Sequence, residues 1–313
     1  MPTMKFYFIV STNEDTPPKD LLNKLKTQGE VVIIRHKGRL SELKQLKNDQ
    51  EEKVFGLDPQ AFDWDLDAES FKNIPNVKAV CSSSTSFGWL KPKTLKKFGI
   101  VACNVPGWSS DSVAEFALSM AINVTRGLPM VIKNDWKYDL DDFLPLRLQG
   151  KTAGIIGLGQ IGTRMAELCK GIGMNVIYWS RKSRDKRFKY VDIDKLFKQA
   201  DLIMPALAEN SHTKKIITHK RLDFMKSSAM LVGIERVRET WDEDYVFEKV
   251  KRGELGGYAL EGKGVKPLEK YKGNVLPLPG MAGYTKDAFQ NLIKIWVENM
   301  IGAAKGKYSD RVN

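Results

Sequence analysis

Residues 152–182, TAGIIGLGQIGTRMAELCKGIGMNVIYWSRK, decide the fold of this chain. An apolar run leads into the pattern GxGxxG, a helix-forming segment follows, and a second apolar run, NVIYW, closes the unit. This order predicts a dinucleotide-binding βαβ unit. Gly157 permits the tight turn, Gly159 lets the backbone approach a pyrophosphate, and Gly162 lets the helix pack closely on the sheet. The alternative, glycines that only turn a strand into a helix, is disfavoured because the pattern lies directly between a strand and a helix.

The residues after each strand of this unit indicate which dinucleotide binds. The amides of Gln160 and Ile161, at the N-terminus of the expected helix, would face the pyrophosphate charge. The second strand ends without the carboxylate that a free ribose 2′-hydroxyl requires, and a serine followed by cations stands there instead. Because guanidinium and phosphate pair through charge-assisted hydrogen bonds, we expect NADP(H) rather than NAD(H). The alternative is a solvated loop that accepts either cofactor. The residues expected around the 2′-phosphate are Ser180, Arg181, Lys182 and Arg184.

Short apolar strands alternate with helices along the rest of the chain. Alternation of this kind predicts an α/β fold with parallel sheets. A charged helix is expected around residues 41–48, and the amphipathic run 286–304 predicts a long helix after the last strand. The other expected strands are residues 5–10, 31–34, 77–81, 100–103, 201–205, 229–234, 257–260 and 274–276.

Composition limits the classes of protein that need to be considered. The chain has 313 residues, 42% of them hydrophobic, which is enough for two cores. Its net charge of +12 suits an anionic small molecule, since the lysines alternate with acidic residues along the whole chain, as on solvated helix faces. Three separated cysteines show no metal-binding spacing. We expect a soluble cytoplasmic protein with no metal, nucleic-acid or membrane partner.

Four further segments occur in a recognisable order: NVPGWSSDSVAEFAL at 104–118, MKSSAMLVGIER at 225–236, RGELGGYALE at 252–261 and NVLPLPGMAGYT at 274–285. Together with the glycine motif they resemble the D-isomer-specific 2-hydroxyacid dehydrogenases, which include glyoxylate, hydroxypyruvate and phosphoglycerate dehydrogenases. The resemblance implies two Rossmann-like or flavodoxin-like domains. A cofactor domain, residues 104–283, would be inserted in a substrate domain formed by residues 1–103 and 284–313. It also implies a homodimer, with the arm around Trp136 in the contact.

The resemblance implies a binding site for a small 2-keto or 2-hydroxy acid. Arg236 falls where the family places the arginine that holds the substrate carboxylate and carbonyl, a contact suited to a bidentate guanidinium. The alternative for Arg236 is a surface arginine beside a helix. Ser83, Ser84 and Thr85 match a turn whose amides bind the carboxylate, although the family usually has glycines there.

The remaining cofactor contacts are also implied by the resemblance. Glu261 takes the place of the family's aspartate that contacts the nicotinamide carboxamide, which keeps the charge but lengthens the reach. Ala206 and Ile234, each at the end of an expected strand, complete the cofactor residues.

The catalytic pair of the family is missing. Reduction of a keto acid needs a proton donor for the forming alkoxide, and the family uses a histidine oriented by a glutamate. Gly280 occupies the histidine position and Lys266 the glutamate position, and no histidine follows His219. The candidates for a relocated donor are Lys266, Lys263, Glu261 and Tyr284.

Two functions from different classes remain open. The first is an NAD(P)-dependent oxidoreductase that reduces a small 2-keto acid to a D-2-hydroxy acid with a non-standard proton donor. The second is a catalytically impaired dinucleotide-binding protein, such as a redox sensor or an assembly partner. Loss of a general acid typically lowers the rate by about 10²- to 10⁴-fold, so slow turnover is compatible with both.

Overall fold

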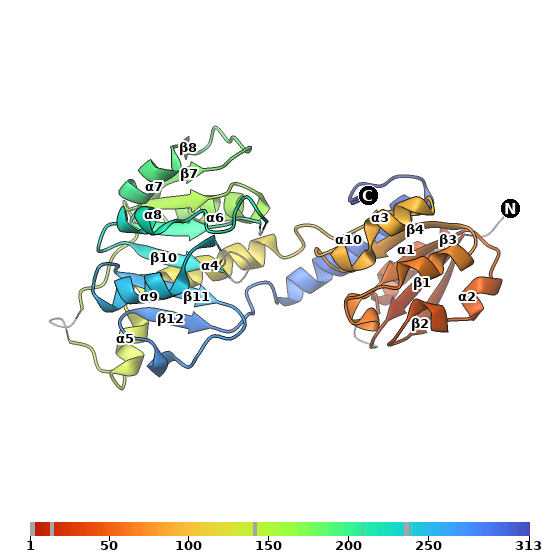
Figure 1. Cartoon of the computed structure of the whole chain (residues 1–313), viewed down its shortest axis with the longest axis horizontal. Helices are drawn as coiled ribbons and strands as arrows, with labels where there is room; N and C mark the ends of the chain where they lie inside the picture. The colour runs from red at the N-terminus through yellow and green to blue at the C-terminus, as the bar shows by residue number, and fades with distance from the viewer. Residues whose placement is uncertain (1–3, 13–15, 140–142, 209, 235–237, 239) are drawn as a thin grey trace. The chain divides into compact units, whose positions relative to one another are not determined.

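The computed structural model describes the chain except for residues 1–3, 13–15, 140–142, 209, 235–237 and 239 (Figure 1). The chain divides into two compact units. Unit 1 consists of Met1–Ser109 and Lys286–Asn313, and unit 2 consists of Ser110–Thr285. The predicted α/β fold, with one parallel-sheet domain inserted in another, is confirmed. In the described part of the chain, no helix combines the length and the apolar character needed to span a membrane.

The sheet of unit 1 has five parallel strands in the order β2-β1-β3-β4-β5, a flavodoxin-like arrangement. Alternate residues of β1 enter different cores, with Phe6 and Phe8 in one cluster and Tyr7 and Ile9 in the other. Helices therefore cover both faces of this sheet. The strands are β1 Lys5–Val10, β2 Glu30–Arg35, β3 Lys53–Leu57, β4 Val77–Ser82 and β5 Val101–Cys103.

The C-terminal helix α10, Lys286–Ala304, covers one face of the unit 1 sheet. Trp296 and Met300 are buried against side chains of β1 and β3, and the Trp296 indole N–H donates to the carbonyl of Cys81 at 2.8 Å. The helix predicted over residues 286–304 is therefore confirmed. The other α-helices of this unit are α1 Lys19–Lys26, α2 Gln45–Asn48 and α3 Pro92–Lys97.

One expected helix of unit 1 is shorter than predicted. Residues 41–48 form a 3₁₀ turn, Leu40–Glu42, followed by the single turn of α2. The buried side chains here are Leu40, Leu43 and Leu46, each three residues apart. Such spacing aligns side chains in a 3₁₀ rather than an α-helical segment.

The sheet of unit 2 has seven parallel strands in the order β12-β11-β10-β9-β6-β7-β8, visible in Figure 1 from β12 at one edge to β8 at the other. Strand order reverses between β6 and β9, as in a Rossmann fold, whose ligands bind at this reversal. The strands are β6 Thr152–Ile156, β7 Asn175–Trp179, β8 Lys189–Tyr190, β9 Leu202–Pro205, β10 Met230–Gly233, β11 Gly257–Glu261 and β12 Val275–Leu278. The helices are α4 Ser110–Thr125, α5 Leu128–Lys133, α6 Gln160–Gly171, α7 Ile193–Gln199, α8 His219–Asp223 and α9 Glu243–Lys251.

Candidate active site

The glycine loop joins β6 to α6 at the reversal of strand order in unit 2. Gly157 has φ +96°, and a Cβ there would lie 2.6 Å from the carbonyl oxygen of Ala206, which follows β9. A Cβ at Gly162 would lie 2.0 Å from the carbonyl oxygen of Gly157. At Gly159, by contrast, a Cβ would meet no atom within 4 Å. Two glycines are therefore required by packing, and the third leaves open space at the start of α6.

The N-terminus of α6 fits a phosphate group. Gly159 is its N-cap residue, and no side chain caps the first turn, so the amides of Gln160 and Ile161 have no side-chain acceptor. The first amides of a helix lack partners within the helix and carry partial positive charge. Open space at Gly159 beside these amides suits the pyrophosphate of a dinucleotide.

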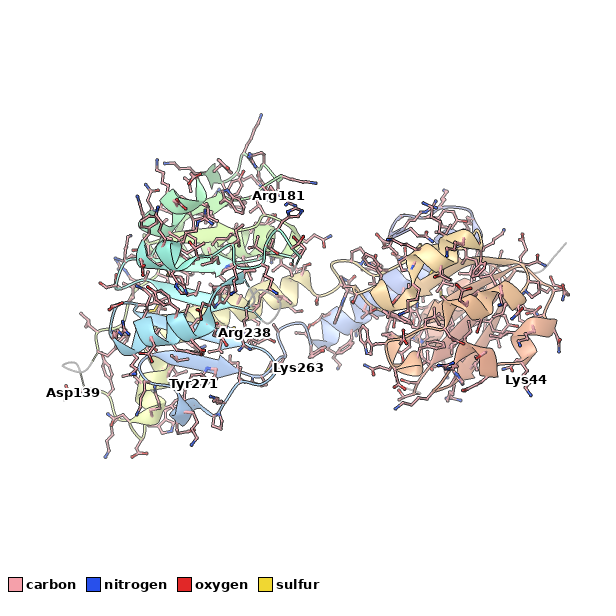
Figure 2. The ribbon with its side chains drawn as sticks, viewed as in Figure 1. Lys44, Asp139, Arg181, Arg238, Lys263 and Tyr271 are labelled. Carbon is pink, nitrogen blue, oxygen red and sulfur yellow. The ribbon has the colours of Figure 1, made fainter. Side chains whose placement is uncertain are left out.

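Cations without internal partners follow β7. Ser180 is buried, and its hydroxyl oxygen accepts the Ser183 N–H at 3.3 Å. Arg181 and Lys182 are exposed, and neither side chain has a hydrogen-bonding or ionic partner among the residues that the structure describes. Figure 2 shows Arg181 on the loop that leaves β7. Two free cations beside a hydroxyl can bind a phosphate ester.

Other arginines of the same loop are held by the protein itself. Arg184 donates to the carbonyl oxygens of Ser180 at 2.9 Å and Ser183 at 2.8 Å. Arg187 forms ion pairs with Asp185 at 2.7 Å and with Glu167 of α6 at 2.6 Å. The hydrogen bond from Arg187 lowers the pKa of the Asp185 carboxyl. Arg184 and Arg187 therefore stabilise the loop, whereas the Arg181 and Lys182 side chains remain available to a ligand.

The predicted substrate turn lies after β4 in unit 1. The Ser83 N–H donates to the carbonyl of Leu57 at 3.0 Å, and the Ser84 N–H donates to the Ser82 hydroxyl at 3.1 Å. The Thr85 hydroxyl donates to the carbonyl of Val105 at 2.8 Å. Among the described residues, the Thr85 N–H has no acceptor. Internal bonds therefore occupy two of the three amides that were expected to bind a carboxylate.

Glu261, at the end of β11, is almost completely buried, with 4% of its surface exposed. Its Oε1 accepts the N–H of Met281 at 2.6 Å and that of Ala282 at 3.1 Å. The carboxylate thus fixes the turn after β12, which includes Gly280. A carboxylate oxygen that accepts hydrogen bonds from two backbone amides is poorly placed to donate a proton to a substrate.

Two lysines lie on the segment after β11. Lys266 is exposed, its N–H donates to the Tyr271 hydroxyl at 2.9 Å, and its ammonium group has no partner in the described part of the chain. Lys263 is exposed as well. Tyr284 is 64% exposed at the end of the turn after β12. Figure 2 labels Lys263 and Tyr271, which both lie between β11 and β12.

Arg236 lies outside the described residues, and the nearby Arg238 has a structural partner. The Arg238 guanidinium binds both carboxylate oxygens of Glu243 and donates to the carbonyl of Lys263 at 3.4 Å. The Tyr258 hydroxyl donates to the same carboxylate at 2.8 Å. Burial, and then Glu243, raise the pKa of Tyr258. Sequence reasoning missed this pair, because nothing in the spacing of Arg238 and Glu243 distinguishes it from a surface ion pair.

The other predicted cofactor residues, Ala206 and Ile234, lie directly after strands of unit 2. Ala206 donates its N–H to the carbonyl of Ile156 at 2.7 Å and lies against the glycine loop. Ile234 is buried after β10. Both therefore lie at the carboxyl end of the sheet, where open α/β sheets bind their ligands.

These features define a two-domain α/β protein with a dinucleotide-binding domain, and comparisons with known proteins identify its family. The model of the "D-isomer specific 2-hydroxyacid dehydrogenase, NAD binding domain" matches residues 115–275. This chain belongs to the D-isomer specific 2-hydroxyacid dehydrogenase family, as the sequence motifs predicted.

Relatives are found over most of the chain. A glyoxylate reductase from Thermococcus litoralis is 29% identical over 261 residues, covering 77% of this chain and 78% of the relative. A D-isomer specific 2-hydroxyacid dehydrogenase from Lactobacillus delbrueckii ssp. bulgaricus, solved with NAD, has a TM-score of 0.80 at 22% identity and covers 99% of this chain and 100% of its own. An acyclic imino acid reductase solved with NADPH and D-Arg has a TM-score of 0.77 at 23% identity, with 99% and 100% coverage. The two solved structures show the shared fold.

Proposed function

We propose that this protein is an NADPH-preferring oxidoreductase that reduces a small 2-keto acid to the D-2-hydroxy acid. The observation that carries the proposal is the open glycine loop of unit 2, beside two free cations, in a chain of this enzyme family. The amides of Gln160 and Ile161 would hold the pyrophosphate, and Arg181 and Lys182 the 2′-phosphate. The bound nicotinamide supplies the hydride.

The proton donor is the unusual part of the proposed reaction. Lys266 is the best candidate, because its ammonium group is exposed and has no partner among the described residues. The Glu261 carboxylate is a weaker candidate, because it already accepts hydrogen bonds from two backbone amides. Arg236 would hold the substrate carboxylate and carbonyl, as the family resemblance implies. A cation there stabilises the developing oxyanion more than the ground-state carbonyl.

The first experiment measures NADPH oxidation with glyoxylate, hydroxypyruvate, pyruvate and bulkier 2-keto acids. Lys266→Ala should lower kcat about a hundredfold with NADPH affinity intact, as expected for a lost general acid. Lys270→Ala, which removes another exposed lysine from the same connection, is the matched control. Unchanged rates in both Lys266→Ala and Glu261→Gln would reject these residues as donors.

A second candidate function is a dinucleotide-binding protein without efficient chemistry. It is favoured by the joint replacement of the family's acid–base pair by Gly280 and Lys266 and by the engaged carboxylate of Glu261. Under this proposal NADPH binds, but the wild-type chain shows no turnover on the keto acid panel. That result would make the binding protein the preferred function.

The cofactor preference has its own test. Calorimetric titration should show tighter binding of NADPH than of NADH, and Arg181→Ala should remove most of the difference. Arg126→Ala, which removes an exposed arginine just after α4, is the control. Equal affinities for the two nucleotides in the wild-type chain would reject the preference.

The proposal also includes a homodimer in the cytoplasm. Trp136 and Leu144, 70% and 78% exposed, lie on the arm after α5 and suit a contact with a second copy. All three cysteines are free, which is compatible with a reducing compartment. Sedimentation of the wild-type chain and of Trp136→Glu tests the dimer, which should dissociate in the variant.

A further inference from the structure

The loop between β7 and β8 is organised around one guanidinium group. Nη1 of Arg184 bridges the carbonyl oxygens of Ser180 at 2.9 Å and Ser183 at 2.8 Å. The guanidinium carbon lies 4.1 Å from the ring centroid of Tyr190 in β8. The Ser183 N–H closes the loop onto the Ser180 hydroxyl. Arg184 therefore holds both ends of the segment that carries Arg181 and Lys182.

These bonds fix the direction of the peptide groups in the loop. A trans peptide is planar, so its C=O and the following N–H point in opposite directions. Because the Ser180 carbonyl points to Arg184, the Arg181 N–H points away from it, and this N–H has no acceptor among the described residues. The same loop thus presents this amide together with the Arg181 and Lys182 side chains, which have no partner among the described residues.

The stacking partner of Arg184 is fixed in turn. Tyr190 packs against the buried Tyr178 of β7, with ring centroids 5.6 Å apart in an edge-on arrangement. The Tyr178 hydroxyl accepts the N–H of Asp185, the residue after Arg184, at 2.9 Å. The position of the Arg184 guanidinium is therefore set by the sheet rather than by solvent.

We propose that Arg184 is a positioning residue that sets nucleotide specificity by fixing the Ser180–Arg181–Lys182 segment in a shape that fits a 2′-phosphate. This inference rests on the proposed preference for NADPH. Arg184 acts through Arg181, since its Nη1 donates to the two carbonyl oxygens and a face of its guanidinium group lies on the Tyr190 ring. Pre-organisation of this kind raises affinity by reducing the ordering that the ligand must impose.

The test is nucleotide binding, which does not require turnover. Arg184→Met should weaken NADPH binding about tenfold, as for one lost charge-assisted contact, and leave NADH binding within about twofold. Adenosine 2′,5′-bisphosphate, as a probe of the adenosine half alone, should lose affinity by the same factor. Arg187→Met is the matched control, because Arg187 belongs to the same loop but forms its ion pairs with Asp185 and Glu167 and lies over the Phe188 ring. It should leave both affinities unchanged.

A double-mutant cycle separates positioning from direct contact. If Arg184 acts by positioning Arg181, the loss of NADPH affinity in Arg181→Met/Arg184→Met is smaller than the sum of the losses in the two single variants. Additive losses would overturn the inference, because they indicate a direct contact between Arg184 and the nucleotide. An equal loss in Arg187→Met would also overturn it, because removal of any loop charge would then suffice.

A second variant keeps the inference testable if Arg184→Met does not fold. Tyr190→Leu removes the ring beneath the guanidinium and should weaken NADPH binding by a smaller factor, about threefold, with NADH binding unchanged. Unaltered NADPH binding in Tyr190→Leu, with the NADPH preference of the wild-type chain intact, would overturn the role of Arg184 alone. A wild-type chain without NADPH preference would overturn the cofactor proposal together with this inference.

Discussion

Each of the two sheets has a point where strand order reverses, and the two points are built differently. In unit 2 the reversal between β6 and β9 holds the glycine loop, which leaves open space at Gly159. In unit 1 the reversal between β1 and β3 is filled by Asp58, which is 5% exposed. Its carboxylate accepts the Ser11 N–H and hydroxyl at 3.2 and 2.8 Å and the Gln60 N–H at 3.1 Å.

The comparison teaches that topology alone does not make a nucleotide site. Both reversals place strand carboxyl ends around a crevice, the usual ligand site of open α/β sheets. The Asp58 carboxylate already binds the amides of Ser11 and Gln60 in unit 1, whereas the amides of α6 in unit 2 have no side-chain cap. An anionic ligand can bind only where the protein has not supplied the anion itself.

The largest effect is expected when the Asp58 carboxylate is removed from the strand-order reversal of unit 1. Asp58→Ala leaves the amides of Ser11 and Gln60 without their acceptor and should lower the free energy of unfolding by about 3 kcal/mol, since buried unsatisfied donors are costly. Urea denaturation followed by tryptophan fluorescence measures this. Asp65→Ala, at a carboxylate that is 75% exposed and paired with Lys91, is the control and should cost less than about 1 kcal/mol. Equal effects would mean that Asp58 has no special role at the reversal.

An intermediate effect distinguishes two glycines of the open reversal. Gly162→Ala places a methyl group against the carbonyl of Gly157 and should destabilise the protein by about 2 kcal/mol through overpacking. Gly159→Ala meets no atom, so its melting temperature should stay unchanged while NADPH affinity falls at least about tenfold. Thermal denaturation and nucleotide titration of the two variants are the measurements. Full NADPH affinity in Gly159→Ala would contradict the assignment of this space to the pyrophosphate.

The smallest effect is expected at the amino-terminal end of β6 and β9, opposite the glycine loop. Asp201 binds Lys226 and the Thr152 N–H, at 2.7 and 2.8 Å. Burial alone would raise the pKa of Asp201, but these hydrogen bonds outweigh it and hold the pKa below its usual value. The unfolded chain then binds the proton more tightly, so the stabilisation is present above about pH 4 and is lost as the pH falls through the folded-state pKa.

Asp201→Asn should therefore make unfolding less dependent on pH between about 5 and 2, by at most about 1 kcal/mol. Urea denaturation at a series of pH values measures the difference. Asp194→Asn removes a more exposed carboxylate, paired with Arg221, and should change the slope less. A steeper slope in Asp201→Asn would contradict a lowered pKa of Asp201 in the folded protein.

Sequence patterns predicted the fold well where apolar runs were long or periodic. The βαβ unit and the helix over 286–304 are both found. The strands of the βαβ unit are uninterrupted apolar runs, and in the helix apolar residues recur every three to four positions. The strand β3 was not predicted. Its short run contains Gly56, where a Cβ would lie 2.6 Å from Sδ of Met300 in α10. A glycine weakens the strand pattern, and its packing reason becomes visible only when the distant helix is in place.

The sequence by itself determined the family, the glycine loop and the absence of an acidic residue at positions 180–182, directly after β7, because each depends on the identity of residues close together in the chain. Only the tertiary structure separated Arg181 and Lys182, whose side chains have no partner in the described part of the chain, from the engaged Arg184. It also assigned the Glu261 carboxylate to the amides after β12. The physical reason is that a charged group becomes available to a ligand only when no group of the folded protein has already bound it, and those partners lie on other strands and loops.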